Sequence, residues 1–228
     1  MKKLEESTVA WPTNGFPATL SAKTRRVYDL VAGVYPLSTM FFHSNAHRCA
    51  LEISGIRNGM RVLEVATGSG EMFDRLVRAN RHGFTMGVDL SPNMAARTQK
   101  RVRETYPYSR AYCQAVDARR MPFRDESFDA VVCCYLLELL ATEDIVQTVD
   151  EFYRVLRNRG KLVLVLIGEN TPVFNRMYRF AGKVAPAFWG RQVEEHVPTV
   201  IEGREFTILQ DRTVRQSGYP SRVIAAHK

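Results

Sequence analysis

A glycine-rich bend between an apolar run and a helical pattern limits the folds open to this chain more than any other feature. Residues 61–66 (RVLEVA) have the aliphatic composition of a strand, and Gly68 and Gly70 follow them. A helical stripe begins at about Glu71, with apolar side chains at Met72, Phe73, Leu76 and Val77. Glycine lets a backbone turn tightly near a ligand, and the next helix points its first N–H groups at the same place. This order predicts an open α/β sheet with a ligand site at the bend.

Short apolar runs alternate with helical patterns along the rest of the chain, which is typical of βαβ units and a mostly parallel sheet. Further strands are predicted at residues 84–89, 111–116, 128–134, 161–166, 205–214 and 221–226. Helices are predicted at residues 23–32, 45–56 and 171–192. Two more are predicted from their N-caps: one begins after Ser91, with Pro92 in its first turn, and the other begins after Thr142. Gly160 is expected to turn the chain from the helix after Thr142 into the strand at 161–166.

Composition sets the broad class. The 228 residues suit one domain with a short N-terminal elaboration, and the longest apolar run, residues 130–137, is far shorter than the ~20 residues of a membrane span. The polar N-terminus has no apolar core of a secretory signal, so a cytoplasmic location is expected.

A net charge of +8 favours anionic partners but equally fits a solvated basic surface. The four cysteines form no C-x-x-C pair, so they are expected to be reduced core residues, and no metal site is expected.

Two acidic residues point to the ligand of the bend. Asp89 ends the second predicted strand 19 residues after Gly70 (89 − 70), an offset at which a carboxylate accepts the hydroxyls of an adenosine ribose. A dinucleotide fingerprint needs a third small residue, and Glu71 or Phe73 stands there instead. No G-K-[ST] of a phosphate loop follows. Glu64 beneath the bend would repel a diphosphate but suits a cationic amino group. The pattern therefore indicates a nucleoside without phosphates that carries an amino acid.

At this point the chain resembles the class I S-adenosylmethionine-dependent methyltransferases, and within them the branch of the ubiquinone and menaquinone biosynthesis C-methyltransferases. The matching stretches, in order, are 61–70 (RVLEVATGSG), 87–94 (GVDLSPNM), 117–123 (DARRMPF) with 127–129 (SFD), and 154–160 (RVLRNRG). The resemblance implies a Rossmann-like fold with a seven-stranded, mostly parallel sheet, an antiparallel C-terminal strand and helices on both faces. It also implies S-adenosyl-L-methionine as the cofactor.

The residues that bind the cofactor in this family can be matched to single positions of the chain. The resemblance implies that Asp117, with the Ala118 backbone beside it, accepts from the adenine amino group. The other cofactor contacts that it implies, together with those argued above, are Glu64, Ala66, Thr67, Gly68, Gly70, Asp89, Leu90, Met94, Cys134, Tyr135, Tyr28 and Tyr35. Ala66 replaces the first glycine of the bend, Pro36 stands where the branch has Asp, and Arg159 replaces a glycine. Plain structural roles stay open for Asp117 as a turn residue and for Met94 as a packing residue.

The family's domain plan implies a helical segment over residues 1–58 that closes over the site and a cofactor-binding domain over 59–228, with a variable cap at 171–200. The aromatic cap suggests a small hydrophobic or lipid-like acceptor, such as a quinone precursor, and leaves a peripheral membrane contact open. Nucleic acid is not an expected partner, because no N-P-P-[YF] follows residue 134 and neither Cys133 nor Cys134 follows a proline. The pattern carries no signal of oligomeric state.

Methyl transfer needs a protein base only if the acceptor must first lose a proton. Candidate bases are His43, His47, Glu138 and His196, and Glu138 is the first choice because its apolar surroundings are expected to raise its pKa. Two other functions stay open. One is a phospholipid N-methyltransferase at a membrane surface, and the other is a protein that binds S-adenosylmethionine without catalysis.

Overall fold

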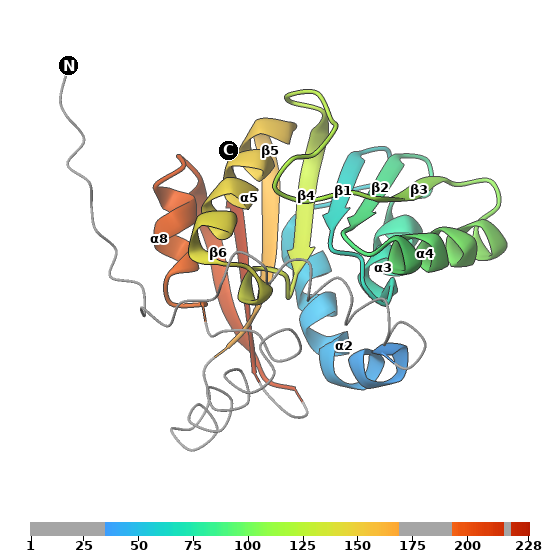
Figure 1. Cartoon of the computed structure of the whole chain (residues 1–228), viewed down its shortest axis with the longest axis horizontal. Coiled ribbons are helices and arrows are strands. Elements are labelled where there is room, and N and C mark those ends of the chain that lie inside the picture. Colours follow the sequence, from blue (N-terminus) through green and yellow to red (C-terminus); the bar gives the residue numbers. More distant parts are fainter. Residues whose placement is uncertain (1–34, 169–192, 217–219) are drawn as a thin grey trace.

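The computed structural model describes residues 35–168, 193–216 and 220–228, with side chains from residue 44 onward. Its core is one seven-stranded sheet in the order β3-β2-β1-β4-β5-β7-β6 (Figure 1). The first five strands run parallel, and β7 is antiparallel to both of its neighbours, which confirms the predicted fold class. The strands are β1 Arg61–Val65, β2 Phe84–Asp89, β3 Arg110–Ala115, β4 Phe128–Cys134, β5 Leu156–Ile167, β6 Thr207–Val214 and β7 Ser221–His227.

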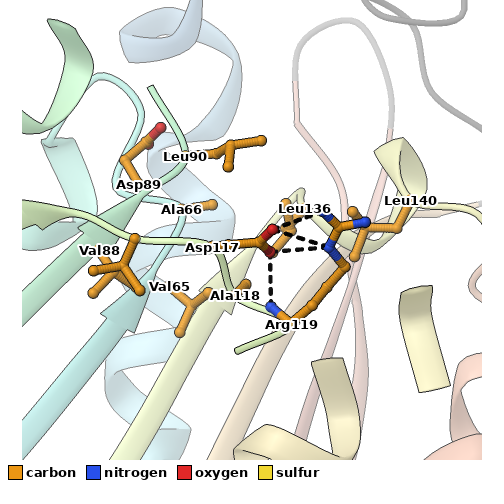
Figure 2. A pocket seen from close by; sticks show the side chains of 11 residues that line it. Val65, Ala66, Val88, Asp89, Leu90, Asp117, Ala118, Arg119, Leu136 and Leu140 are labelled. Atoms are coloured by element: carbon orange, nitrogen blue, oxygen red, sulfur yellow. Dashed lines mark hydrogen bonds and ion pairs between the residues drawn. The ribbon is translucent and has the colours of Figure 1, made fainter. Parts of the chain in front are cut away.

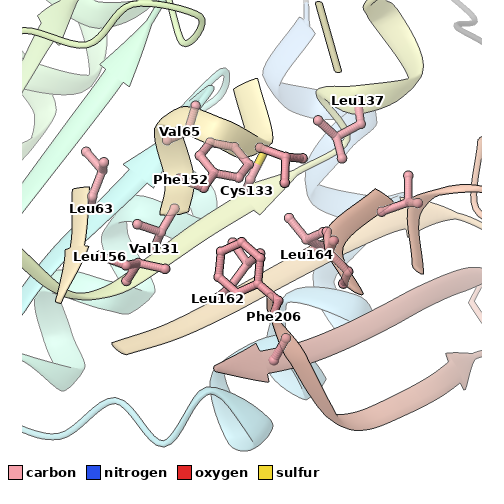
Figure 3. Close-up of a cluster of buried hydrophobic side chains, with 14 of the residues drawn as sticks. Leu63, Val65, Val131, Cys133, Leu137, Phe152, Leu156, Leu162, Leu164 and Phe206 are labelled. Atoms are coloured by element: carbon pink, nitrogen blue, oxygen red, sulfur yellow. The ribbon is translucent and has the colours of Figure 1, made fainter. Parts of the chain in front are cut away.

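Helices cover both faces of the sheet. They are α2 Tyr35–Ser54, α3 Glu71–Ala79, α4 Pro92–Thr105, α5 Thr142–Val155 and α8 Val197–Glu202, with a 3₁₀ turn η1 at Leu137–Leu139. Because successive strand residues point to opposite faces, Leu63 and Val131 pack with α5 and α8, whereas Val62 and Val132 pack with α2 and α3. Figure 3 shows the first of these two cores, where Phe152 of α5 lies over strands β1, β4 and β5.

Three predicted boundaries were wrong. Helix α2 begins at Tyr35, ten residues before the predicted start, and it tolerates Pro36 because a first-turn N–H has no partner to lose. Ala141, not Thr142, is the N-cap of α5, and no side chain caps it. Strand β5 begins at Leu156, directly after α5, and its pairing with β4 shifts between Phe128 and Ala130. Gly160 therefore lies inside an irregular strand. The predicted helices at 23–32 and 171–192 lie outside the described residues.

The cysteines are free thiols, as predicted. Cys113, Cys133 and Cys134 are buried within strands, and Cys49 on α2 is half-buried.

Asn80 joins α3 to the beginnings of β1 and β2. Its side-chain oxygen accepts from the backbone N–H groups of Gly59 (2.9 Å) and Met60 (3.0 Å). Its amide group donates to the Met60 carbonyl (2.9 Å) and to the Thr85 hydroxyl (3.2 Å). One buried side chain thus joins the amino ends of β1 and β2, which lie at the end of the sheet opposite the glycine bend.

Asn80→Ala is expected to lower the free energy of unfolding by about 3 kcal/mol, because the partly buried N–H groups of Gly59 and Met60 lose their acceptor and the buried Thr85 hydroxyl loses a donor. Urea denaturation followed by circular dichroism measures this. Asn58→Ala is the matched control, since exposed Asn58 accepts one bond from the His82 N–H, and it is expected to cost less than about 0.5 kcal/mol. Equal losses in the two variants would contradict the role of Asn80.

Candidate functional site

The chain order reverses at β1, whose neighbours are β2 on one side and β4 on the other. In open α/β sheets the carboxyl ends of strands at such a point form a crevice for ligands. The glycine bend lies there. Ala66 and Thr67 donate backbone hydrogen bonds to the Val88 carbonyl (2.8 and 3.2 Å), and the bend ends at Gly70, the N-cap of α3. Ala66, Gly68 and Gly70 have positive φ angles of 64°, 46° and 76°.

Asp89 holds the bend in place. One of its carboxylate oxygens accepts from the Gly68 N–H at 2.8 Å, and the other accepts from the Ser91 N–H at 2.9 Å. Ser91 in turn caps α4 by accepting from the Met94 N–H at 3.2 Å, as predicted from the sequence. The carboxylate at the tip of β2 therefore connects the bend to the start of α4.

Glu64 lies beneath the bend and is only 1% exposed. Within the described part of the chain its Oε2 atom has no hydrogen-bond partner. Burial raises its pKa well above the usual value, and the nearby carboxylates of Asp89 and Glu71 raise it further. A buried carboxyl oxygen in this condition can accept from a donor, and a cation beside it would favour the ionised form.

A pocket opens beside the bend between the tips of β1, β2 and β4. It is lined by Val65, Ala66, Val88, Asp89, Leu90, Val116, Asp117, Ala118, Arg119, Leu136 and Leu140 (Figure 2). Five predicted cofactor residues are thus brought together: Ala66, Asp89, Leu90, Asp117 and Ala118. The mostly aliphatic walls suit a flat ring, and the acidic groups at the rim suit hydroxyl or amino donors.

Arg119 is a pocket residue that the sequence did not reveal. Its guanidinium binds the Asp117 carboxylate (Nη2–Oδ2 2.6 Å, Nε–Oδ1 3.0 Å) and reaches Asp144 at 3.0 Å. The bonds from Arg119 lower the pKa of Asp117 despite its partial burial. The carboxylate also accepts from the Arg119 backbone N–H at Oδ1 (3.0 Å) and from Nε at Oδ2 (3.2 Å), so a further donor would have to share oxygens that already accept from Arg119. The sequence offered one signal of this ion pair, because Asp117 stands two residues before Arg119.

Other predicted cofactor residues lie near the bend without lining this pocket. Met94 is buried in α4 at 1% exposure, which fits the packing role left open for it. Thr67 lies against Cys113, 3.5 Å from oxygen to sulfur, and Cys134 is buried in the α2 face of the sheet. Tyr28 lies outside the described residues, and Tyr35 begins α2 with its side chain outside them.

Tyr135 follows β4 with a positive φ of 55°. Its hydroxyl lies 2.7 Å from the Ser221 hydroxyl and accepts from the Gln216 amide at 3.2 Å. The Gln216 oxygen also accepts from the Ala46 N–H of α2 at 3.3 Å. Neither Gln216 nor Ser221 was expected, because they come from the far end of the chain and only the fold brings them to the strand tips.

Glu138 is buried at 2% exposure, and its Oε1 accepts from the Ile167 N–H at 2.6 Å. Burial raises its pKa to about 7. Burial also raises the pKa of the thiols of Cys133 and Cys134. After burial, the group that raises the pKa most is Glu138 for Cys133 and Glu64 for Cys134. Glu64 points to the α2 face of the sheet, because it alternates along β1 with Leu63 and Val65 of the α5 face.

The pKa of Glu138 predicts a pH-dependent stability. Ionisation of this group costs free energy in the folded state, so its contribution to stability falls as the pH rises from about 4.5 to about 7. Glu138→Gln is therefore expected to gain about 2 kcal/mol in unfolding free energy relative to wild type between pH 5 and pH 8. Urea titrations at both pH values measure the gain, with exposed Glu143→Gln as control. A constant difference between Glu138→Gln and wild type would contradict the buried ionisation.

No described helix has the length and apolar character needed to cross a membrane. No group of three or more His, Cys, Asp or Glu side chains among these residues is placed to hold a metal ion.

Known proteins share this fold. The [4+2]-cyclase SpnF superimposes with a TM-score of 0.75 at 20% identity, covering 94% of this chain and 98% of that one. The N-methyltransferase NodS from Bradyrhizobium japonicum, solved with S-adenosyl-L-homocysteine, gives 0.72 at 16% identity, covering 90% and 98%. One of these proteins is named a cyclase, so the likeness establishes the fold and not the reaction.

Proteins related in sequence say more about the family of this chain than the shared fold does. Residues 62–160 match the family model described as a methyltransferase domain. The ubiquinone/menaquinone biosynthesis C-methyltransferase UbiE from Methylococcus capsulatus is 30% identical over 182 residues, which are 74% of this chain and 70% of that protein. A 2-phytyl-1,4-naphtoquinone methyltransferase from Nostoc sp. is 28% identical over 151 residues, 64% of this chain and 65% of that protein. Together with the crevice at β1, these matches show that the chain belongs to the class I S-adenosylmethionine-dependent methyltransferases.

Proposed function

We propose that the enzyme methylates a ring carbon of a reduced, prenylated quinone precursor. The acceptor class is suggested by the relatives, whose names refer to ubiquinone, menaquinone and phytyl-naphtoquinone. An oxidised quinone ring is poor in electrons, whereas a hydroquinone carries hydroxyl groups that make the neighbouring ring carbon a nucleophile. The reduced form is therefore the chemically competent acceptor.

The observation that carries the cofactor placement is the buried Glu64 carboxyl group, whose Oε2 atom has no hydrogen-bond partner among the described residues. S-adenosylmethionine supplies a methyl group already activated by positive sulfur. Glu64 would bind the amino group of its methionine part, and Asp89 at the next strand tip would accept from the ribose hydroxyls. The aliphatic pocket would hold the adenine ring, with Asp117 near its amino group.

These assignments put the cofactor across the carboxyl ends of β2, β1 and β4. The protein's part in the reaction is then to align the reactants and to exclude water. Gly68 would lie beside the methionine part, because an added Cβ there meets nothing within 4 Å and its positive φ angle favours glycine. An added Cβ at Gly70 would instead lie 2.9 Å from Oγ1 of Thr98 in α4, so that glycine serves the packing of the bend.

Cofactor binding is expected to release a proton from Glu64. Its pKa is raised in the free protein, and a bound ammonium group favours the ionised carboxylate. Calorimetry with S-adenosylhomocysteine near neutral pH, in two buffers with different ionisation enthalpies, measures the release. Glu64→Gln is expected to reduce the released proton and to weaken binding at least tenfold, or ~1.4 kcal/mol. Glu52→Gln, an exposed change on α2, is the control. A wild-type binding enthalpy that does not depend on the buffer would contradict the assignment.

The acceptor class is tested by offering two lipids in vesicles, a 2-prenyl-1,4-naphthoquinol kept reduced and phosphatidylethanolamine. The expected result is methylation of the naphthoquinol alone. A ring-deuterated quinol is expected to lose its deuterium, which separates transfer to carbon from transfer to oxygen. Methylation of phosphatidylethanolamine would establish the lipid N-methyltransferase instead. Cofactor binding without methylation of either lipid would contradict the proposed acceptor.

A further inference from the structure

An arginine and two carboxylates lie together at the pocket beside the glycine bend. Arg119 contacts Asp117 in the loop after β3 and Asp144 in the first turn of α5. We propose that Arg119 determines which purine base this pocket accepts, because it holds the Asp117 carboxylate as a fixed acceptor that cannot donate. This role rests on the proposed placement of the cofactor. Arg119 is a positioning residue, since it acts on the ligand through Asp117.

The Asp117 carboxylate is held by four contacts from Arg119. Its Oδ2 accepts from Nη2 at 2.6 Å, and its Oδ1 accepts from Nε and from the backbone N–H, both at 3.0 Å. The contact from Nε to Oδ2 is longer, at 3.2 Å. Because Nε has a better acceptor in Oδ1, this long contact is the one that an arriving donor would replace. Figure 2 shows the carboxylate and the guanidinium side by side among the residues that line the pocket.

Asp144 holds the other side of the guanidinium. Nη1 of Arg119 donates to Oδ1 of Asp144 at 3.0 Å, and both side chains are 26% exposed. An acidic residue in the first turn of a helix is favoured by the partial positive charge of the helix N-terminus, so Asp144 is a well-placed anchor. The planar fork of the guanidinium lets it bind two carboxylates at once, and it thereby joins the pocket wall to α5.

Arg119 also sets the charge of Asp117. Its bonds lower the pKa of the Asp117 carboxyl group, although partial burial alone would raise it. The other charged groups described around Asp117 are Asp144 on α5 and Asp89, which lines the same pocket from the end of β2. Both are acidic, so without Arg119 they and burial would favour a protonated Asp117. A protonated carboxyl group can donate a hydrogen bond, whereas the ionised form only accepts.

An acceptor without a proton distinguishes between purine bases. The 6-amino group of adenine is a donor and suits an ionised Asp117. The 6-oxo group of hypoxanthine is an acceptor, and it would place an oxygen against the carboxylate with no proton between them. A site built for a donor rejects the analogue that lacks it, because a polar group is then left without a partner. By keeping Asp117 ionised and in place, Arg119 selects the adenine ring.

The test compares the binding of S-adenosylhomocysteine and S-inosylhomocysteine by calorimetry at pH 7 and pH 5. The two ligands share the methionine part, so the ratio of their dissociation constants cancels the effect of Glu64. Wild type is expected to prefer S-adenosylhomocysteine by at least about 20-fold at both pH values. Arg119→Gln is expected to lower this preference about threefold at pH 7, because Asp117 is no longer held in place. At pH 5 the loss is expected to reach about tenfold, because part of the Asp117 is then protonated.

Arg119→Lys separates charge from geometry. Lysine keeps a positive charge beside Asp117 but lacks the fork that binds two carboxylates. Its preference for S-adenosylhomocysteine is therefore expected to stay below that of wild type and to be the same at pH 7 and pH 5. Exposed Arg120→Gln is the matched control, the same change at the next residue, and it is expected to behave as wild type.

A wild-type ratio in Arg119→Gln at both pH values would overturn the inference, even if both ligands bind more weakly, because a structural role changes the two affinities equally. Asp117→Asn tests the placement of the cofactor separately. Its amide can donate to the 6-oxo group, so the preference is expected to fall below about twofold. If Asp117→Asn keeps the wild-type preference, the adenine ring does not lie at Asp117, and the proposed placement fails together with the inference. No methyl acceptor takes part, so the identity of the acceptor does not affect the result.

Discussion

The carboxylate of Asp89 is the contact on which the shape of the site depends. Its two oxygens accept from the N–H groups of Gly68 and Ser91, which belong to the bend after β1 and the start of α4. Because both donors are backbone groups, the carboxylate fixes the course of the main chain and not merely a side chain. The bend then sets where α3 begins, and with it the position of Glu71. One acidic residue at a strand tip thus determines how two helices and the pocket wall are placed.

Negative charge concentrated beneath this bend explains the kind of ligand that fits. Burial opposes the ionisation of Glu64 most strongly, and the carboxylates of Asp89 and Glu71 oppose it further, so the pKa of Glu64 is raised in the free protein. A cation at this place would favour the ionised form of Glu64, whereas a diphosphate would meet the carboxylates of Asp89 and Glu71. This distinguishes the site from dinucleotide sites built on the same strand–bend–helix pattern. Phe73 occupies the position of the third small residue of those sites, and it packs against Gly87, where an added Cβ would lie 2.9 Å from the ring.

Local sequence was enough to predict most of the sheet and the first carboxylates of the site. Strands β2 and β4 have the predicted bounds, and α4 begins after the predicted Ser91 cap, because periodicity and capping are local properties. The contacts of Arg119 and Gln216 could not be predicted, since each depends on distant segments meeting at the strand tips. Glu138 was chosen as a base for its apolar surroundings; its burial and raised pKa are confirmed, and its catalytic role stays a prediction.

The burial of three of the four cysteines has a practical consequence. Burial raises the pKa of Cys133 and Cys134 well above the usual value and that of Cys113 to about 12, so these thiols have little thiolate and little access to reagents. Cys49, half-buried on α2, is the most accessible thiol. It lies two positions after His47 on the same helix. A fluorophore attached at Cys49 would therefore report, without any engineered cysteine, how that helix moves against the sheet when ligands arrive.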